Sequence, residues 1–119
     1  MKLIIQTIIL ILFISIAVLY FLYKKPISIE NVLKNFPSEL KFYQYSNGKI
    51  IEEKNLSRND NEYVKLLKIL KDNKDGWKYE VMSYAPEKYF VGKEISINVK
   101  KNIIVINDNT KKVQFIHNY

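Results

Sequence analysis

The chain has 119 residues, a formal net charge of +7 and no cysteine. The absence of cysteine excludes disulfides, thiolate catalysis and cysteine-ligated metals, although it does not choose a compartment. All but one of the 19 basic residues are lysine, the exception being Arg58. Because specific base and phosphate recognition favours the bidentate guanidinium of arginine, we expect no nucleic-acid partner.

The first segment, Leu3–Leu22, is apolar and carries no charge, glycine or proline. Roughly 20 helical residues span about 30 Å, the thickness of the hydrocarbon core of a bilayer. The segment predicts one transmembrane helix, with residues 1–25 as a membrane anchor, residues 3–22 in the bilayer and residues 26–119 as a soluble domain. A cleaved signal peptide is the less favoured alternative, because the apolar stretch is long and no small-x-small site follows it.

The end of the apolar segment indicates a membrane surface. Tyr20, Tyr23, Lys24 and Lys25 combine interfacial aromatic rings with ammonium groups that reach the headgroups. These lysines favour a cytoplasmic domain by the positive-inside rule, whereas the short N-terminal tail is typical of a signal anchor, which exports the C-terminus. We expect a single-pass protein of the inner or plasma membrane, with the exported side favoured for the domain.

Two elements are predicted directly after the anchor. Apolar residues spaced i, i+3, i+4 and i+7 after Ser28 predict a short helix; they are Ile29, Val32, Leu33 and Phe36. Residues 41–45 and 49–53 then flank Asn47-Gly48, a pair that type I′ turns prefer because both residues take positive φ. This pattern predicts a β-hairpin.

A longer helix is expected from Asn59 or Asp60 to about Lys74. Its first turn has the spacing of a capping box, Asn59 with Glu62, and Gly76 is placed to terminate it. An apolar stripe follows one face of this helix and consists of Tyr63, Leu66, Leu67 and Leu70. The stripe predicts that this face packs against a sheet.

Period-two alternation after Trp77 predicts a run of antiparallel strands over residues 77–84, 95–99, 103–106 and 112–117. The fold class is therefore α+β: one N-terminal transmembrane helix followed by a small two-layer domain with an antiparallel sheet packed against a helix. The third of these strands is apolar on both faces, as in a central strand. The side chains expected to be buried together are Trp77, Val81, Leu67, Leu70, Ile97, Val105 and Phe115.

The sequence offers no catalytic, metal-binding or cofactor-binding pattern. His117 is the only histidine, and its place in the last expected strand favours a surface or core-edge imidazole over a catalytic base. With only three glycines, the chain has no glycine-rich loop for phosphate. We expect no enzyme activity, no cofactor, no metal and no small-molecule substrate.

The candidate partner-binding residues are Tyr89, Phe90 and Val91, in a segment, 86–93, that we expect to be a loop, together with Tyr84. Apolar side chains at a loop tip can bind a partner or touch the membrane. The alternative places Phe90 and Val91 over the core and Tyr89 at its rim. A second set of residues can line a binding face of the sheet or simply edge a small core: Tyr43, Tyr45, Tyr79 and Tyr84.

The function that we expect is a non-enzymatic protein-interaction domain held at the membrane, with another protein as its partner. One alternative is a peripheral domain that binds anionic lipids through its excess of lysine. In another alternative, the small, singly anchored, cysteine-free architecture resembles that of bacterial immunity proteins, which block a toxin at the inner membrane. That likeness lies in the architecture alone.

Overall fold

The structure is a computed structural model that describes residues 1–24 and 26–119. The interfacial role expected of Tyr23, Lys24 and Lys25 lies outside the side chains that it describes. Helix α1 (Lys2–Lys24) exposes every side chain from Lys2 to Leu22. It is long and apolar enough to cross a membrane, a property that a signal sequence near the N-terminus would share.

Two hydroxyl groups within α1 are satisfied by the helix itself. Thr7 Oγ1 donates to the carbonyl oxygen of Leu3 at 2.8 Å, and Ser15 Oγ donates to that of Ile11 at 2.9 Å. Such bonds to the preceding turn leave no hydroxyl proton that requires water. Both side chains are therefore compatible with an apolar surrounding.

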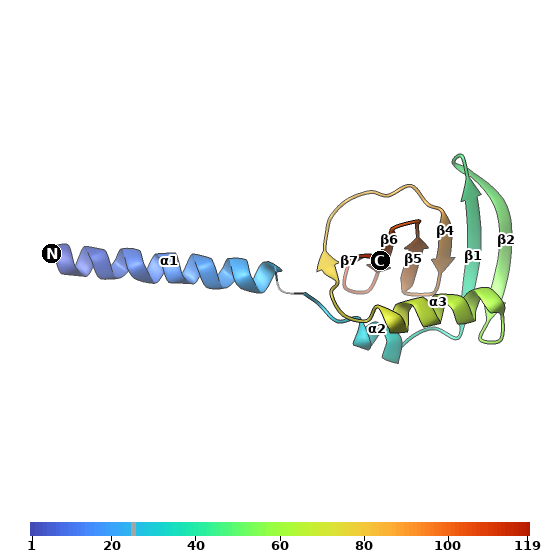
Figure 1. Cartoon of the computed structure of the whole chain (residues 1–119), viewed down its shortest axis with the longest axis horizontal. Coiled ribbons are helices and arrows are strands. Elements are labelled where there is room, and N and C mark those ends of the chain that lie inside the picture. Colours follow the sequence, from blue (N-terminus) through green and yellow to red (C-terminus); the bar gives the residue numbers. More distant parts are fainter. Residues whose placement is uncertain (25) are drawn as a thin grey trace.

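The described residues after α1 form an α+β domain around a seven-stranded antiparallel sheet, in the order β2-β1-β4-β5-β6-β7-β3 (Figure 1). The helices of this domain are α2 (Glu30–Lys34) and α3 (Asn61–Asp72). The strands are β1 (Glu39–Ser46), β2 (Lys49–Ser57), β3 (Lys78–Tyr79), β4 (Lys88–Val91), β5 (Ile95–Val99), β6 (Ile103–Asp108) and β7 (Val113–Asn118). The expected α+β class, with an N-terminal helix capable of spanning a membrane, is confirmed.

The predicted hairpin is present as β1 and β2. Its turn residues Asn47 and Gly48 have φ values of 52° and 76°, as a type I′ turn requires. The pairing runs from Ser46 opposite Lys49 to Glu39 opposite Ser57, with one irregularity after Gln44. The local Asn-Gly signal therefore sets the register of the longest strand pair in the sheet.

The hydrophobic core is one cluster of buried residues to which both α3 and the strands contribute. Helix α3 contributes the buried residues Tyr63, Leu66 and Leu70, and Leu67 packs against them with part of its surface exposed. Of the residues expected in the core, four belong to this buried cluster: Leu70, Trp77, Ile97 and Phe115. The stripe predicted for the helix is therefore the face that it buries.

Val81 and Val105 do not belong to this core. Val81 has a relative exposure of 103%, so its predicted burial is wrong. The strand expected over 77–84 is limited to Lys78–Tyr79, after which the chain leaves the sheet. Val105 is buried at 2% exposure, but it lies outside the core cluster, and in β6 it alternates with the core residues Ile104 and Ile106.

Residues 80–87, which we call the strap, connect β3 to β4 across the sheet (Figure 1). Asn98 of β5 accepts a hydrogen bond from the Glu87 amide at 3.0 Å and donates one to the Ala85 carbonyl at 3.2 Å. Gln114 of β7 donates to the Met82 carbonyl at 2.8 Å. Because Asn98 lies opposite Val105 in the β5–β6 register, these bonds hold the strap over the sheet face on which Val105 is buried.

Candidate functional site

Partly exposed aromatic side chains meet on the sheet face opposite the core, on strands β1 and β4. Tyr43 lies directly opposite Tyr89 in the register, and Val91 lies opposite Lys41. Tyr45 follows two residues after Tyr43, with the two ring centroids 6.5 Å apart. Tyr43, Tyr45, Tyr89 and Val91 are all intermediate in exposure, and we call this group the tyrosine face.

Lys41 on β1 lies at one side of the tyrosine face, next to Tyr43. Lys41 Nζ lies 5.5 Å from the centroid of the Tyr43 ring and 3.0 Å from Glu53 Oε1. The hydrogen bond to Glu53 raises the pKa of Lys41 above its ordinary value, and Tyr43 acts in the same direction. The ammonium group therefore keeps its charge at neutral pH and places a cation beside the ring.

The structure brings together only two of the four predicted partner-binding residues. Tyr89 and Val91 share the tyrosine face, whereas Phe90 points to the core, is 4% exposed and lies with its ring centroid 4.9 Å from that of Phe42. The loop expected over 86–93 is wrong at Lys88–Val91, which forms β4 between β1 and β5. Alternation along a strand explains why Phe90 and its two neighbours lie on opposite faces.

Tyr84, the fourth predicted residue, lies in the strap. Its hydroxyl group donates to Glu80 Oε1 at 2.8 Å, and this hydrogen bond raises the pKa of Tyr84 above its ordinary value. Both residues belong to the strap, so the bond joins its first residue to its middle. This contact gives Tyr84 a local structural role, separate from the tyrosine face.

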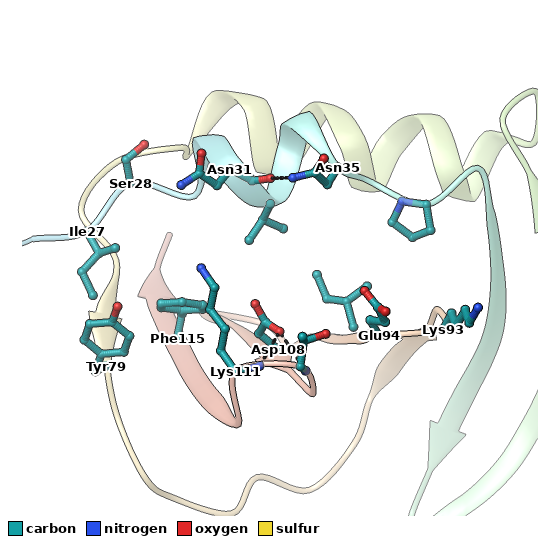
Figure 2. A pocket seen from close by; sticks show the side chains of 14 residues that line it. Ile27, Ser28, Asn31, Asn35, Tyr79, Lys93, Glu94, Asp108, Lys111 and Phe115 are labelled. Carbon is teal, nitrogen blue, oxygen red and sulfur yellow. Dashed lines mark hydrogen bonds between the residues drawn. The ribbon is translucent and has the colours of Figure 1, made fainter.

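A cavity of about 520 Å³ lies between α2 and the strand ends of β5, β6 and β7 (Figure 2). Its apolar lining includes Ile27, Val32, Ile95 and Phe115, which come from four separate segments of the chain. No local pattern predicts this cavity, because only the tertiary fold brings these segments together. Eight of the fourteen lining residues are polar or charged, so the cavity has a mixed surface.

Polar side chains surround the cavity. Asn35 Nδ2 donates to the Asn31 carbonyl at 3.2 Å, and Asp108 Oδ1 accepts from the Thr110 and Lys111 amides at 3.0 and 3.2 Å. Asp108 is therefore occupied in shaping the turn before β7. Among the described lining residues none is a histidine or a cysteine.

His117 lies at the edge of the core, where it joins β7 to the end of α3. Its Nδ1 is 3.2 Å from the Gly76 carbonyl oxygen and its Nε2 is 3.1 Å from Asn73 Oδ1. The imidazole also stacks on Trp77, with 5.1 Å between ring centroids, and the indole Nε1 donates to the Asn73 carbonyl. With both nitrogens engaged, the ring acts as a structural connection.

Within the part of the chain that the structure describes, no group of three or more His, Cys, Asp or Glu side chains could hold a metal ion. Comparisons with protein-family models, with curated proteins and with solved structures found no match to this chain.

Proposed function

We propose that the chain is a single-pass membrane protein whose domain binds another protein at the membrane surface through the tyrosine face. The observation that carries this proposal is the cross-strand pair Tyr43–Tyr89, with Tyr45 and Val91 beside it on the same sheet face. The rings offer apolar area and keep hydroxyl groups for hydrogen bonds at a rim. Tyrosine is enriched at the centres of protein–protein interfaces for this reason.

Membrane anchoring is supported by the surface of α1. Its side chains from Lys2 to Leu22 are exposed and largely apolar, so no part of the domain shields them from solvent. An apolar surface of this extent requires an apolar surrounding, and a bilayer matches its length. The domain is then a two-layer unit, with α3 on one sheet face and both the strap and the tyrosine face on the other.

The proposed role is non-enzymatic. Its support is that the only histidine has both ring nitrogens engaged by Gly76 and Asn73 and stacks on Trp77. Because both partner atoms are acceptors, a neutral ring donates to only one of them, and its place between Gly76, Asn73 and Trp77 favours a structural role.

The side of the membrane on which the domain lies stays a prediction, and we favour the exported side. Fusions of alkaline phosphatase and of a cytoplasmic fluorophore at Tyr119 distinguish the two orientations. For an exported domain, the phosphatase fusion should be active and the fluorophore fusion should not fluoresce. A fluorescent fusion without phosphatase activity would place the domain in the cytoplasm and would leave the binding proposal intact.

Site-specific crosslinking in cells tests the binding proposal. A photoreactive phenylalanine analogue at Tyr43 should capture one discrete protein, whereas the same analogue at Ile51, exposed on edge strand β2, should not. The captured protein is then purified and its affinity for variants of the full chain is measured. Loss of a central tyrosine should weaken binding by about 2 kcal/mol, or roughly 30-fold.

The matched variants are Tyr89→Ala and Tyr79→Ala. Tyr79 is also a partly exposed tyrosine, but it lies on edge strand β3 and contacts Phe115. We expect the Tyr89 variant to lose binding and the Tyr79 variant to retain it, at salt concentrations where charge interactions are screened beyond about 3 Å. Equal losses in both variants, or binding that salt abolishes, would refute recognition through the tyrosine face.

A further inference from the structure

Three exposed side chains with apolar surface lie at the edge strand β3 and in the first residues of the strap that follows it. Tyr79 is 51% exposed, Val81 is 103% exposed and Met82 is 59% exposed. We call these three residues the apolar edge. Val81 projects fully into its surroundings, so core packing does not account for it.

The apolar edge lies where the chain from α1 joins the domain. Ile27 forms an antiparallel bridge with Trp77, in which the Ile27 amide donates to Trp77 O at 2.8 Å and the Trp77 amide donates to Ile27 O at 3.0 Å. The Ile29 amide adds a bond to the Lys74 carbonyl at 2.8 Å. These bonds attach the incoming segment beside β3, on the side of the domain that Figure 1 shows toward α1.

Covalent reach limits how far this edge can lie from a membrane that α1 spans. The chain between Leu22 and Ile27 reaches at most about 18 Å, at roughly 3.6 Å per residue. Each headgroup layer is roughly 5–8 Å thick, since a bilayer of about 40–45 Å has a hydrocarbon core of about 30 Å. The tether is therefore short enough for β3 to reach the interfacial layer, although at full extension Ile27 would lie about 10–13 Å beyond that layer.

We propose that the apolar edge docks into the interfacial layer of the bilayer that α1 spans. Tyr79 has the amphipathic ring that this layer favours, and Val81 and Met82 supply apolar side chains next to it. Lys78, exposed on the same short strand, is placed to meet anionic headgroups. Because the domain is tethered, a small patch suffices: docking is intramolecular and benefits from a high effective concentration.

Docking would fix the orientation of the domain on the membrane. β3 and β2 are the two opposite edges of the sheet, so β2 would lie farthest from the bilayer. Ile27 and Tyr79 line one end of the cavity beneath α2, and this end would face the headgroups (Figure 2). The tyrosine face on β1 and β4 would remain in water, available to a protein partner.

This inference rests on the proposed membrane anchoring and not on the proposed protein partner. The test uses the full chain in vesicles of phosphatidylcholine and phosphatidylglycerol. Since the chain has no native cysteine, a nitroxide can be attached at Val81→Cys and, as the matched control, at Ile51→Cys, which is 62% exposed on β2. Power saturation with oxygen and a water-soluble nickel chelate then reports the depth of each label.

We expect the ratio of oxygen to nickel accessibility at position 81 to exceed that at position 51 several-fold. Equal, water-like ratios would overturn docking while the chain still floats with the vesicles, which leaves anchoring intact. Failure of the chain to float would overturn anchoring and docking together.

A second variant tests the side chains themselves. A nitroxide at Lys78→Cys should report the headgroup layer when Val81 and Met82 are present and become water-like in the Val81→Ser, Met82→Ser chain. Both replaced side chains are exposed, so the fold should persist. A label whose depth is unchanged by the double substitution would show that the apolar edge does not hold the domain at the bilayer.

Discussion

Replacing Leu70 with alanine should remove a large share of the stability of the domain. Leu70 is fully buried on α3, within the cluster shared with the sheet. At about 0.8 kcal/mol for each buried methylene, the lost transfer energy is roughly 2.4 kcal/mol. The cavity left behind raises the expected loss to about 3–4 kcal/mol, within the range of about 2–5 kcal/mol for buried leucines.

Unfolding in urea or heat, followed by the fluorescence of Trp77, measures this loss in the full chain in detergent micelles. Trp77 is the only tryptophan and is fully buried, so its emission reports the core directly. At about 4–8 °C for each kcal/mol in a domain of this size, the melting temperature should fall by about 12–32 °C.

Two other positions on α3 provide matched controls. Leu67→Ala should have a smaller effect, because Leu67 is only partly buried, and Val64→Ala should change stability by at most about 0.5 kcal/mol, because Val64 is 52% exposed. If Leu70→Ala and Val64→Ala unfold alike, α3 does not pack on the sheet through this face.

Three further substitutions test separate features. Asn98→Ala removes two of the side-chain bonds that hold the strap, so limited proteolysis should cut residues 80–87 faster while the core spectrum of Trp77 is retained. His117→Phe keeps a ring on Trp77 but loses both nitrogen contacts, and should lower unfolding free energy by about 1–3 kcal/mol in urea titrations. Gly48→Ala should destabilise the hairpin by more than about 1 kcal/mol through its φ of +76° alone, since no atom would contact the added Cβ.

Short sequence patterns predicted the elements whose conformation depends mainly on residues close in the sequence. Asn47-Gly48 identified the β1–β2 hairpin because a two-residue turn with positive φ has few other solutions. The stripe of α3 was also readable, since its spacing alone indicates the buried face. These predictions needed no knowledge of distant strands.

The strands between Trp77 and Val91 could not be placed from the sequence. Residues 77–84 alternate as a strand does, yet β3 pairs with β7 only at Lys78 and Tyr79 before the strap begins. The segment 88–91 becomes β4 because β1 and β5 provide partners on both sides. Both outcomes depend on pairing across long sequence separations, which alternation does not encode.

At the start of α3, Glu62 contacts another partner than the one predicted for it. The predicted capping box of Asn59 and Glu62 is wrong, because Asp60 is the N-cap residue and its carboxylate accepts from the backbone and hydroxyl groups of Ser57. Glu62 instead lies 2.6 Å from Lys54 Nζ on β2. That bond lowers the pKa of Glu62 and raises that of Lys54.

The candidate site was predicted in part. Tyrosine content suggested a binding face, but only the β1–β4 register brings Tyr43 and Tyr89 together and turns Phe90 into the core. The cavity beneath α2 had no sequence signal, since its lining comes from α2, the segment before it and three strand ends.

The attachment of the domain to a bilayer is the central claim, and fractionation with intact mass measurement tests it most directly. After carbonate extraction of cells that express the chain, the protein should remain in the membrane pellet at the full mass of 14.2 kDa. A chain that begins at Pro26 should be recovered in the supernatant as a folded domain. Recovery of the full chain in the supernatant, or a shorter species lacking α1, would contradict the account.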